Sequence, residues 1–391
     1  MADQASTTTV GSRHGHLPEG APLSAELVQG DVRVRFAEGT VTLPADWLRD
    51  VCPCADCCIV QTDERRWQPW SDGVRAEAAS VDVVHDVLEV TWRCGHRSAY
   101  DAATFAAIES ALHRGEHAAE LWSAGHELTR FEHDDIVADD ITRRHLFEVF
   151  LRDGAVVVTG APRRSGACAD LLTALGIPLR ELAHGRVFDV TVDPEGYNVA
   201  YTAEAIPPHN DNAQCSHPPS GQVLAMLVNE TSGGESIVVD GWSVLDRLAE
   251  HDPAAVDVLC RVAVGFRQYS ADAEGFTRMP IAARDVDGRI CHLRFSNQLR
   301  QPLPFDHPDL AAWYDAYRRL GRMVTDPARQ VRFRLGAGDM LMVNGLRVLH
   351  GRTAFVPDGR RHLQDVYFEV DDVIGNLARL TGAATNAMVW S

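Results

Sequence analysis

His209-Asn-Asp211 and the two apolar runs behind it, Gln222-Val-Leu-Ala-Met-Leu-Val228 and Ile237-Val-Val-Asp-Gly241, decide which fold this sequence predicts. Both runs are short, continuous and bounded by turn residues, which is typical of buried strands. The turn between them, Thr231-Ser-Gly-Gly-Glu-Ser236, contains paired glycines that adopt positive φ without a steric penalty. The segment therefore indicates consecutive strands joined by tight turns, with His209 just after a strand end.

A second set of predicted strands lies near the C-terminus and leads to another histidine. Val331-Arg-Phe-Arg-Leu335 alternates apolar and polar residues with a period of two, Gly336-Ala-Gly-Asp339 turns the chain, and Met340 to Val343 forms the next strand. His350 follows in the run Val-Leu-His-Gly-Arg. Side chains at strand ends converge at the mouth of a jelly roll. We therefore predict an α+β fold whose larger part is a double-stranded β-helix, or jelly roll, with helices.

His209, Asp211 and His350 make up a ligand set that suits a divalent iron. Residues i and i+2 of an extended segment point to the same side, so His209 and Asp211 can reach one ion. Two neutral imidazoles and one carboxylate occupy one face of an octahedron and leave the other face open for a co-substrate and dioxygen. A bare H-x-D tripeptide also arises as a loop histidine capped by an aspartate, so its meaning depends on the surrounding sequence.

Arg361 lies eleven residues after His350, in the run Arg360-Arg-His-Leu-Gln-Asp-Val-Tyr367. A planar guanidinium can hold a carboxylate through two parallel hydrogen bonds. The distal carboxylate of 2-oxoglutarate would need such a partner. An isolated pair such as Arg360 and Arg361 is ordinarily a pair of surface charges, but the spacing from His350 favours the co-substrate role for Arg361.

With these motifs, the sequence resembles the 2-oxoglutarate-dependent dioxygenases of the taurine dioxygenase superfamily. More narrowly, it resembles the γ-butyrobetaine and trimethyllysine hydroxylases. The matching stretches follow the family order: Trp47-Leu-Arg-Asp-Val-Cys-Pro-Cys-Ala-Asp-Cys57, Asn198-Val-Ala-Tyr-Thr202, His209-Asn-Asp211, Gly233-Gly-Glu-Ser-Ile-Val-Val-Asp-Gly241, Leu349-His-Gly-Arg352 and Arg361-His-Leu363. The resemblance implies Fe(II) at His209, Asp211 and His350. It also implies 2-oxoglutarate held by Arg361, with Asn198 as a second contact.

The same resemblance implies a substrate pocket with aromatic walls. Family members that act on trimethylammonium compounds surround the cation with ring faces, which attract positive charge. Tyr201 and Tyr367 match two of these positions, and two more fall at His184 and Phe188. His184 departs from the tyrosine expected there, and Phe188 replaces a larger indole. A quaternary ammonium substrate is therefore one candidate, and simple packing remains the alternative role for Tyr201 and Phe188.

A cysteine cluster marks a second metal site. Cys52-Pro-Cys-Ala-Asp-Cys-Cys58 brings four thiols together, and Cys94-Gly-His96 follows a predicted hairpin. Structural zinc takes four nitrogen or sulfur ligands in a tetrahedron. The resemblance points to Cys52, Cys54, Cys57 and His96 as the set, with Cys58 and Cys94 spare although either could substitute. The alternative is a group of buried thiols without a metal.

Composition bounds the partners of this chain. The 391 residues carry a net charge of −18, which argues against a nucleic-acid or anionic membrane surface. No apolar run reaches the length of a membrane span, and the start lacks a basic region followed by an apolar core. Nine cysteines with no disulfide-like spacing agree with a cytoplasmic protein. The relatives suggest a homodimer.

The chain divides into four predicted parts. Residues 1–24 are small and polar and predict a disordered tail, whereas residues 25–115 predict a small β-rich zinc-binding domain. Residues 116–150 predict a helical connection. Residues 151–391 predict the jelly-roll domain that carries the Fe(II) and 2-oxoglutarate sites.

We expect a dioxygenase that couples 2-oxoglutarate and dioxygen to hydroxylation of an unactivated C–H bond in a small molecule such as a betaine-like trimethylammonium compound. Desaturation or cyclisation remain open as outcomes. Alternative substrates for the same iron chemistry are a phosphonate, a nucleotide or a secondary-metabolite intermediate. A catalytically silent metal-binding protein is a rival hypothesis, and the complete ligand set with Arg361 argues against it. A zinc hydrolase would need a ligand set suited to zinc and a general base, and nothing in the sequence beyond the same three ligands offers one.

Overall fold

The computed structural model describes residues 16–59, 62, 64–70, 75–112, 119–182, 185–192, 199–269 and 274–381. The chain forms two compact units, a smaller one over residues 11–116 and a larger one over residues 117–377. Residues 1–15 of the tail expected over residues 1–24 lie outside the described residues. Beyond it, Leu17 already packs against the core of the smaller unit and Ser24 begins a strand.

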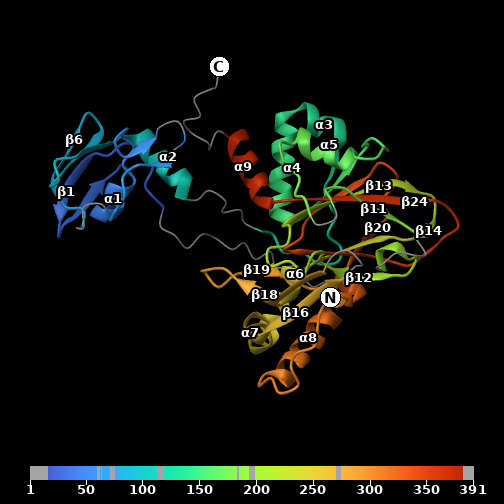
Figure 1. The fold of residues 1–391 in the computed structure, drawn as a ribbon. Coiled ribbons are helices and arrows are strands. Elements are labelled where there is room, and N and C mark those ends of the chain that lie inside the picture. Colours follow the sequence, from blue (N-terminus) through green and yellow to red (C-terminus); the bar gives the residue numbers. More distant parts are fainter. Residues whose placement is uncertain are drawn as a thin grey trace, which may run out of the picture. The chain divides into compact units, whose positions relative to one another are not determined.

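The smaller unit contains two three-stranded antiparallel sheets (Figure 1). Alternation decides which side chains are buried: Val32, Val34 and Phe36 are at most 2% exposed, while the residues between them face solvent. The predicted hairpin is confirmed, because its two strands pair from Val84 and Val87 outward. The elements are β1 (Ser24–Val28), β2 (Asp31–Arg35), β3 (Thr40–Leu43), α1 (Ala45–Asp50), β4 (Cys58–Ile59), β5 (Glu64–Arg65), β6 (Ala78–Val84), β7 (Val87–Trp92), β8 (Arg97–Tyr100) and α2 (Ala102–Leu112).

Two sheets form the centre of the larger unit. The six-stranded sheet has the order β11-β24-β13-β21-β10-β9 and is antiparallel except for the pair β9 and β10. The four-stranded sheet has the order β12-β22-β15-β20 and is antiparallel throughout. Their strands are β9 (Arg130–Glu132), β10 (Ala155–Thr159), β11 (Phe188–Thr191), β12 (Ile206–His209), β13 (Gly221–Asn229), β15 (Ser236–Asp240), β20 (Val331–Phe333), β21 (Met340–Asn344), β22 (Val348–Arg352) and β24 (Arg361–Phe368).

The two sheets pack face to face through an apolar core. Met226, Leu341 and Leu363 from the six-stranded sheet join Val238 and Val348 from the four-stranded sheet in one buried cluster. Three further antiparallel pairs form separate two-stranded sheets: β14 (Ser232–Gly233) with β23 (Phe355–Val356), β16 (Ala263–Tyr269) with β17 (Glu274–Pro280), and β18 (Ala282–Arg284) with β19 (Ile290–Leu293).

Helices cover both sides of this core. On one side α4 packs on β10 and β21, and α5 packs on β13 and β24; on the other, α6, α7 and α8 pack together (Figure 1). Asp240 begins α6 because its carboxylate accepts the backbone N–H groups of Trp242 and Ser243. The helices are α3 (His133–Ala138), α4 (Asp140–Asp153), α5 (Ala167–Ala174), α6 (Gly241–His251), α7 (Pro253–Arg261), α8 (Leu310–Thr325) and α9 (Val370–Leu380), with 3-10 turns η1 (Val199–Tyr201) and η2 (Pro327–Arg329).

The predicted α+β class is confirmed. The segment 116–150, for which a helical connection is predicted, lies in the larger unit from residue 117 onward. Phe147 and Phe150 of α4 are fully buried, and β9 pairs with β10 in the six-stranded sheet. Among the described residues, no helix is both long and apolar enough to span a membrane.

Candidate active site

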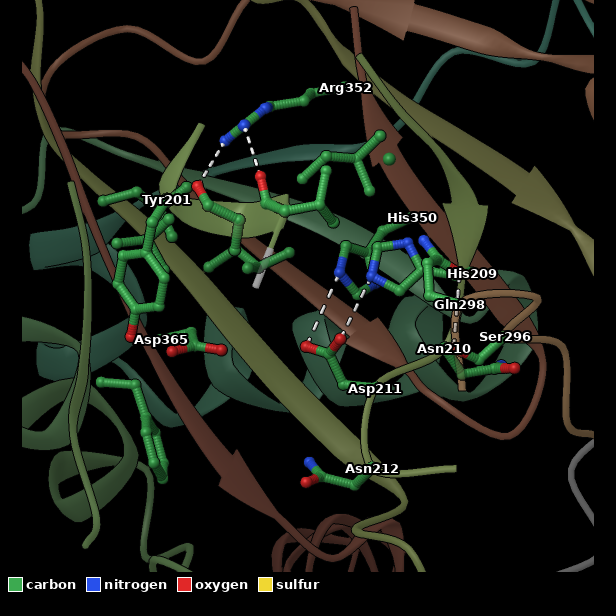
Figure 2. Close-up of a pocket in the computed structure, with 18 of the residues that line it drawn as sticks. Tyr201, His209, Asn210, Asp211, Asn212, Ser296, Gln298, His350, Arg352 and Asp365 are labelled. Atoms are coloured by element: carbon green, nitrogen blue, oxygen red, sulfur yellow. Dashed lines mark hydrogen bonds and ion pairs between the residues drawn. The ribbon is translucent and has the colours of Figure 1, made fainter. Parts of the chain in front are cut away.

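A cavity of about 420 Å³ opens in the larger unit. Its walls come from the ends of β12 and β22, from β11 and β24 on the six-stranded sheet, and from the η1 turn. His209, Asp211 and His350 lie in this wall together with Arg361 and Tyr367 (Figure 2 shows the first three). Residues far apart in the sequence therefore meet around one space.

The three predicted metal ligands converge. His209 is the last residue of β12, and it lies directly opposite His350 of β22 in the antiparallel register. One ligand atom from each of His209, Asp211 and His350 lies within 4.8 Å of the other two. The Nε2 atom of His209 is 3.2 Å from Oδ1 of Asp211, and Nε2 of His350 is 3.8 Å from Oδ2 (Figure 2). Neighbouring ligands at about 2.1 Å from a first-row metal stand about 3 Å apart, so the set fits one ion.

Hydrogen bonds and burial set the protonation of these ligands. Nδ1–H of His209 donates to the carbonyl oxygen of Pro207 at 3.0 Å, so Nε2 is the ring nitrogen that faces Asp211 and that a metal could take. Burial lowers the pKa of His350 to about 4 although Asp211 acts against it. Burial alone would raise the pKa of Asp211, but His350 and His209 hold it well below its usual range. A neutral His350 and an ionised Asp211 are the forms that bind a metal.

Polar side chains of the six-stranded sheet orient Asp211. Gln222 on β13 donates from Nε2 to Oδ2 of Asp211 at 2.8 Å. The hydroxyl of Tyr367 on β24 lies 2.8 Å from the same oxygen. Both groups also reach Oδ2 of Asp365, at 2.8 and 2.9 Å. Burial and the negative charge of Asp211 raise the pKa of Asp365 to about 7.

Arg361 and Arg360 have opposite environments. Arg361 lines the cavity, and its Nε is buried without a hydrogen-bond partner among the described residues. Burial and the charge of Arg334 lower the pKa of Arg361, and an anionic carboxylate would offset that penalty. Arg360 is 78% exposed and forms an ion pair with Glu230 at 2.8 Å. The structure thus distinguishes the two arginines that the sequence places side by side.

Arg352 holds one wall of the cavity. Its guanidinium donates to the carbonyl oxygens of Val199 and Ala200, at 3.3 and 3.1 Å (dashed lines from Arg352 in Figure 2). It also donates to the carbonyl oxygen of Thr202. Two of these carbonyls belong to the η1 turn, whose Tyr201 lines the cavity, and Thr202 directly follows that turn. Arg352 therefore fixes the backbone of this turn.

The predicted aromatic residues are only partly placed. Tyr201, Phe188 and Tyr367 all line the cavity, and the rings of Phe188 and Tyr367 meet edge to face with centroids 5.6 Å apart. His184 and Asn198 lie outside the described residues, so their roles stay predictions.

The predicted zinc ligands converge in the smaller unit. Nε2 of His96 lies 3.4, 3.6 and 3.5 Å from the sulfur atoms of Cys52, Cys54 and Cys57. With zinc–sulfur and zinc–nitrogen bonds of about 2.3 and 2.1 Å, two tetrahedral ligands stand about 3.6 Å apart, so this set fits zinc. Burial and the charge of Arg49 lower the pKa of His96 and keep its imidazole neutral.

Outer groups support this cysteine cluster. Arg49 donates to the sulfur of Cys57 at 2.9 Å, and Ser98 donates to the sulfur of Cys52 at 3.1 Å. Such donors stabilise thiolates bound to a metal. Cys58 and Cys94 lie outside the four-ligand set.

Sequence reasoning missed Gln222, Asp365 and Arg352 as parts of the site. Gln222 and Asp365 stand in apolar or mixed strands, where a single polar residue at a buried position is the available signal. Arg352 lies in the motif Leu349-His-Gly-Arg352. Its partners are backbone carbonyls, which a sequence pattern cannot reveal.

Two family models match this chain. The taurine catabolism dioxygenase TauD, TfdA family matches residues 119–367, and the gamma-butyrobetaine hydroxylase-like, N-terminal family matches residues 26–106.

Individual relatives cover nearly the whole chain. A gamma-butyrobetaine dioxygenase of Pseudomonas sp. (strain AK-1) is 32% identical over 90% of this chain and 94% of its own length. The Homo sapiens gamma-butyrobetaine dioxygenase is 25% identical over 88% and 92%. The mitochondrial trimethyllysine dioxygenase of Gallus gallus is 25% identical over 96% and 92%. Among solved structures, an asparagine oxygenase in complex with Fe(II), 2S,3S-3-hydroxyasparagine and succinate is 24% identical, with a TM-score of 0.47 over 59% of this chain and 80% of that chain.

Proposed function

Because the chain belongs to the taurine catabolism dioxygenase TauD, TfdA family, we propose that His209, Asp211 and His350 hold its ferrous iron and that Arg361 holds 2-oxoglutarate. The chain is a 2-oxoglutarate-dependent iron dioxygenase that hydroxylates an unactivated C–H bond of a small molecule. One observation carries the assignment of residues: the three ligand atoms meet in the wall of the cavity that also contains the unpartnered Nε of Arg361.

Each protein group has a distinct part in this proposal. When bound, iron with 2-oxoglutarate and dioxygen supplies the oxidising power for C–H hydroxylation. Asp211 is oriented by Gln222 and Tyr367, which keeps its charge and direction constant. Arg361 binds the distal carboxylate of 2-oxoglutarate as a bidentate partner. The largely apolar walls of the cavity limit water around the reacting carbon.

The substrate is proposed to be a small cationic compound of the betaine-like class. Support comes from Phe188, Tyr367 and Tyr201, whose rings line the cavity and can attract a positive charge. The names of the relatives, gamma-butyrobetaine dioxygenase and trimethyllysine dioxygenase, agree with a substituted ammonium compound.

Four further assignments are proposals. The two packed sheets are the double-stranded β-helix of the family, and the cluster Cys52, Cys54, Cys57 and His96 holds a structural zinc. The chain forms a homodimer and acts in the cytoplasm. Light scattering on the purified full chain tests the dimer, and metal analysis tests the zinc.

The function is tested by loading the full chain with Fe(II) without dioxygen and then adding 2-oxoglutarate, air and candidate ammonium compounds. Amine-dependent succinate formation together with a hydroxylated product is expected. His209→Ala should abolish both. Succinate formation that is equal in wild type and His209→Ala would contradict the assignment of the iron ligands.

A further inference from the structure

The strand that brings the first metal ligand has a weak backbone ladder. Strand β12 lies at the edge of the four-stranded sheet, next to β22. Pro207 and Pro208 have no N–H to donate, and the register with β22 shifts between Ile206 and His209. The position of His209 opposite His350 therefore needs a restraint besides the hydrogen bonds between these two strands.

Asn210, the residue between the two ligands of the H-x-D motif, supplies such a restraint. It is only 6% exposed, and Figure 2 shows it beside Ser296. Its backbone N–H donates to the carbonyl oxygen of Phe295 at 2.9 Å, and its Oδ1 atom accepts the backbone N–H of Phe295 at 2.5 Å. Residue 210 is thus bound twice to the segment that follows β19.

The other end of the same amide reaches the segment of the third ligand. Nδ2 of Asn210 donates to the carbonyl oxygen of Gly345 at 2.7 Å. Gly345 lies in the turn between β21 and β22, and β22 carries His350. One side chain therefore connects the segment of His209 and Asp211 with the segment that leads to His350.

The two partners require an amide at this position. One partner is a carbonyl oxygen and the other is an N–H group, so the side chain must donate at one end and accept at the other. A carboxylate would place an acceptor against the carbonyl oxygen of Gly345. An apolar side chain would leave both buried backbone groups without this partner, which is costly.

Resting on the proposed function, we infer that Asn210 is a positioning residue of the iron site, which sets the separation between the His209–Asp211 pair and His350. Both polar atoms of its amide are engaged with backbone groups, so Asn210 offers no ligand atom of its own. It acts on the three ligands through the backbone that carries them.

The test measures Fe(II) binding to the full chain with Asn210→Leu and with Asn210→Ser. Leucine keeps the branched shape and removes both polar atoms, whereas serine is smaller, leaves room for water and is too short to reach both partners. Dissociation constants are measured by calorimetry without dioxygen. Both variants should bind Fe(II) roughly tenfold to a hundredfold more weakly than the wild type, as is usual for groups that orient metal ligands.

Two further measurements report the geometry of the site. Co(II) added in place of Fe(II) shows the arrangement of its ligands in its visible absorption bands, and these bands should shift in both Asn210 variants. The amount of hydroxylated product formed per succinate should also fall, because the reacting groups are placed less accurately.

Asn376→Leu is the matched control. Nδ2 of Asn376 also donates to a distant backbone carbonyl oxygen, that of Gly176 at 3.0 Å, and connects α9 with the turn after α5. Asn376 is not among the residues that line the cavity. This variant should lower the midpoint of thermal unfolding, as Asn210→Leu should, but its affinity for Fe(II) and its Co(II) spectrum should match the wild type.

Several outcomes would overturn the inference and leave the proposed function standing. One is wild-type Fe(II) affinity in both Asn210 variants while His209→Ala loses it. Another is an equal loss of affinity in Asn376→Leu, which would indicate a general loss of stability. Failure of both Asn210 variants to fold would assign the residue a structural role alone. Equal Fe(II) binding by wild type and His209→Ala would instead overturn the proposed iron site, and the inference with it.

Discussion

Three thiols and one imidazole meet in the smaller unit, whereas two imidazoles and one carboxylate meet in the larger unit. The first set comes from one tight loop and the end of a hairpin, and two of its cysteines are buried. The second set comes from two paired strands and lies in the wall of a cavity of about 420 Å³.

The contrast shows how ligand number and surroundings separate structural from reactive metal sites. Four soft ligands at tetrahedral distances leave no position for another molecule. Three ligands of mixed type leave several positions, and here these face a cavity that also contains Arg361 and Asp365. Substitutions in either metal cluster, or in the residues around it, should therefore affect one centre and spare the other.

The largest effect is expected from breaking the cysteine cluster. Cys57→Ser should lose the bound zinc and with it the cooperative folding of the smaller unit, a loss on the order of 10 kcal/mol. Metal analysis and proteolysis of residues 16–112 measure this. Cys94→Ser, at an exposed cysteine outside the cluster, should keep one zinc per chain. Stoichiometric zinc in Cys57→Ser would contradict the assignment.

Breaking the other cluster should remove activity and leave the fold intact. Asp211→Ala is expected to lower succinate formation by at least about 10³-fold, because the metal centre supplies several kcal/mol of transition-state stabilisation. Zinc content and the unfolding transition of the smaller unit should match the wild type. Loss of zinc in this variant would mean that the two centres are not independent.

The two neighbouring arginines offer a smaller and sharper test. Arg361→Ala should raise KM for 2-oxoglutarate roughly 100-fold, since it removes a bidentate charge-assisted pair. Arg360→Ala should leave KM unchanged, because Arg360 is exposed and paired with Glu230. Equal effects of both substitutions on initial rates would argue against a specific role for Arg361.

The smallest effect, a weaker binding of Fe(II), is expected from replacing Gln222, which donates a hydrogen bond to Asp211. Gln222→Met removes one of the two donors to this carboxylate and should weaken Fe(II) binding roughly tenfold. Calorimetric titration with Fe(II) without dioxygen measures the change. Zinc binding in the smaller unit should not respond.

Local patterns predicted much of the fold. The branched apolar run of β13, the alternation of Val32, Val34 and Phe36, and the paired glycines of the 231–236 turn each depend on neighbours in the chain. Long-range packing could not be predicted from such local patterns. Whether α4 packs on β10 and β21 depends on strands that lie after it in the chain, one of them at long range.

The residues of the candidate site likewise fall into those that the sequence nominates and those that only the fold reveals. Residue type and spacing nominated His209, Asp211, His350 and Arg361, whereas the choice of Cys52, Cys54 and Cys57 among the clustered cysteines followed from the family resemblance. Gln222 and Asp365 could not be nominated, because each acts through a strand partner on a different element.

The sequence by itself determined which side chains could bind a metal and which strands could form, because both follow from residue type and short-range periodicity. Only the tertiary structure decided that β12 and β22 pair in the register that sets His209 opposite His350. It also decided that Oδ1 of Asp365 is buried without a partner among the described residues. Register, burial and the direction of a hydrogen bond are properties of several strands at once, so no single segment contains them.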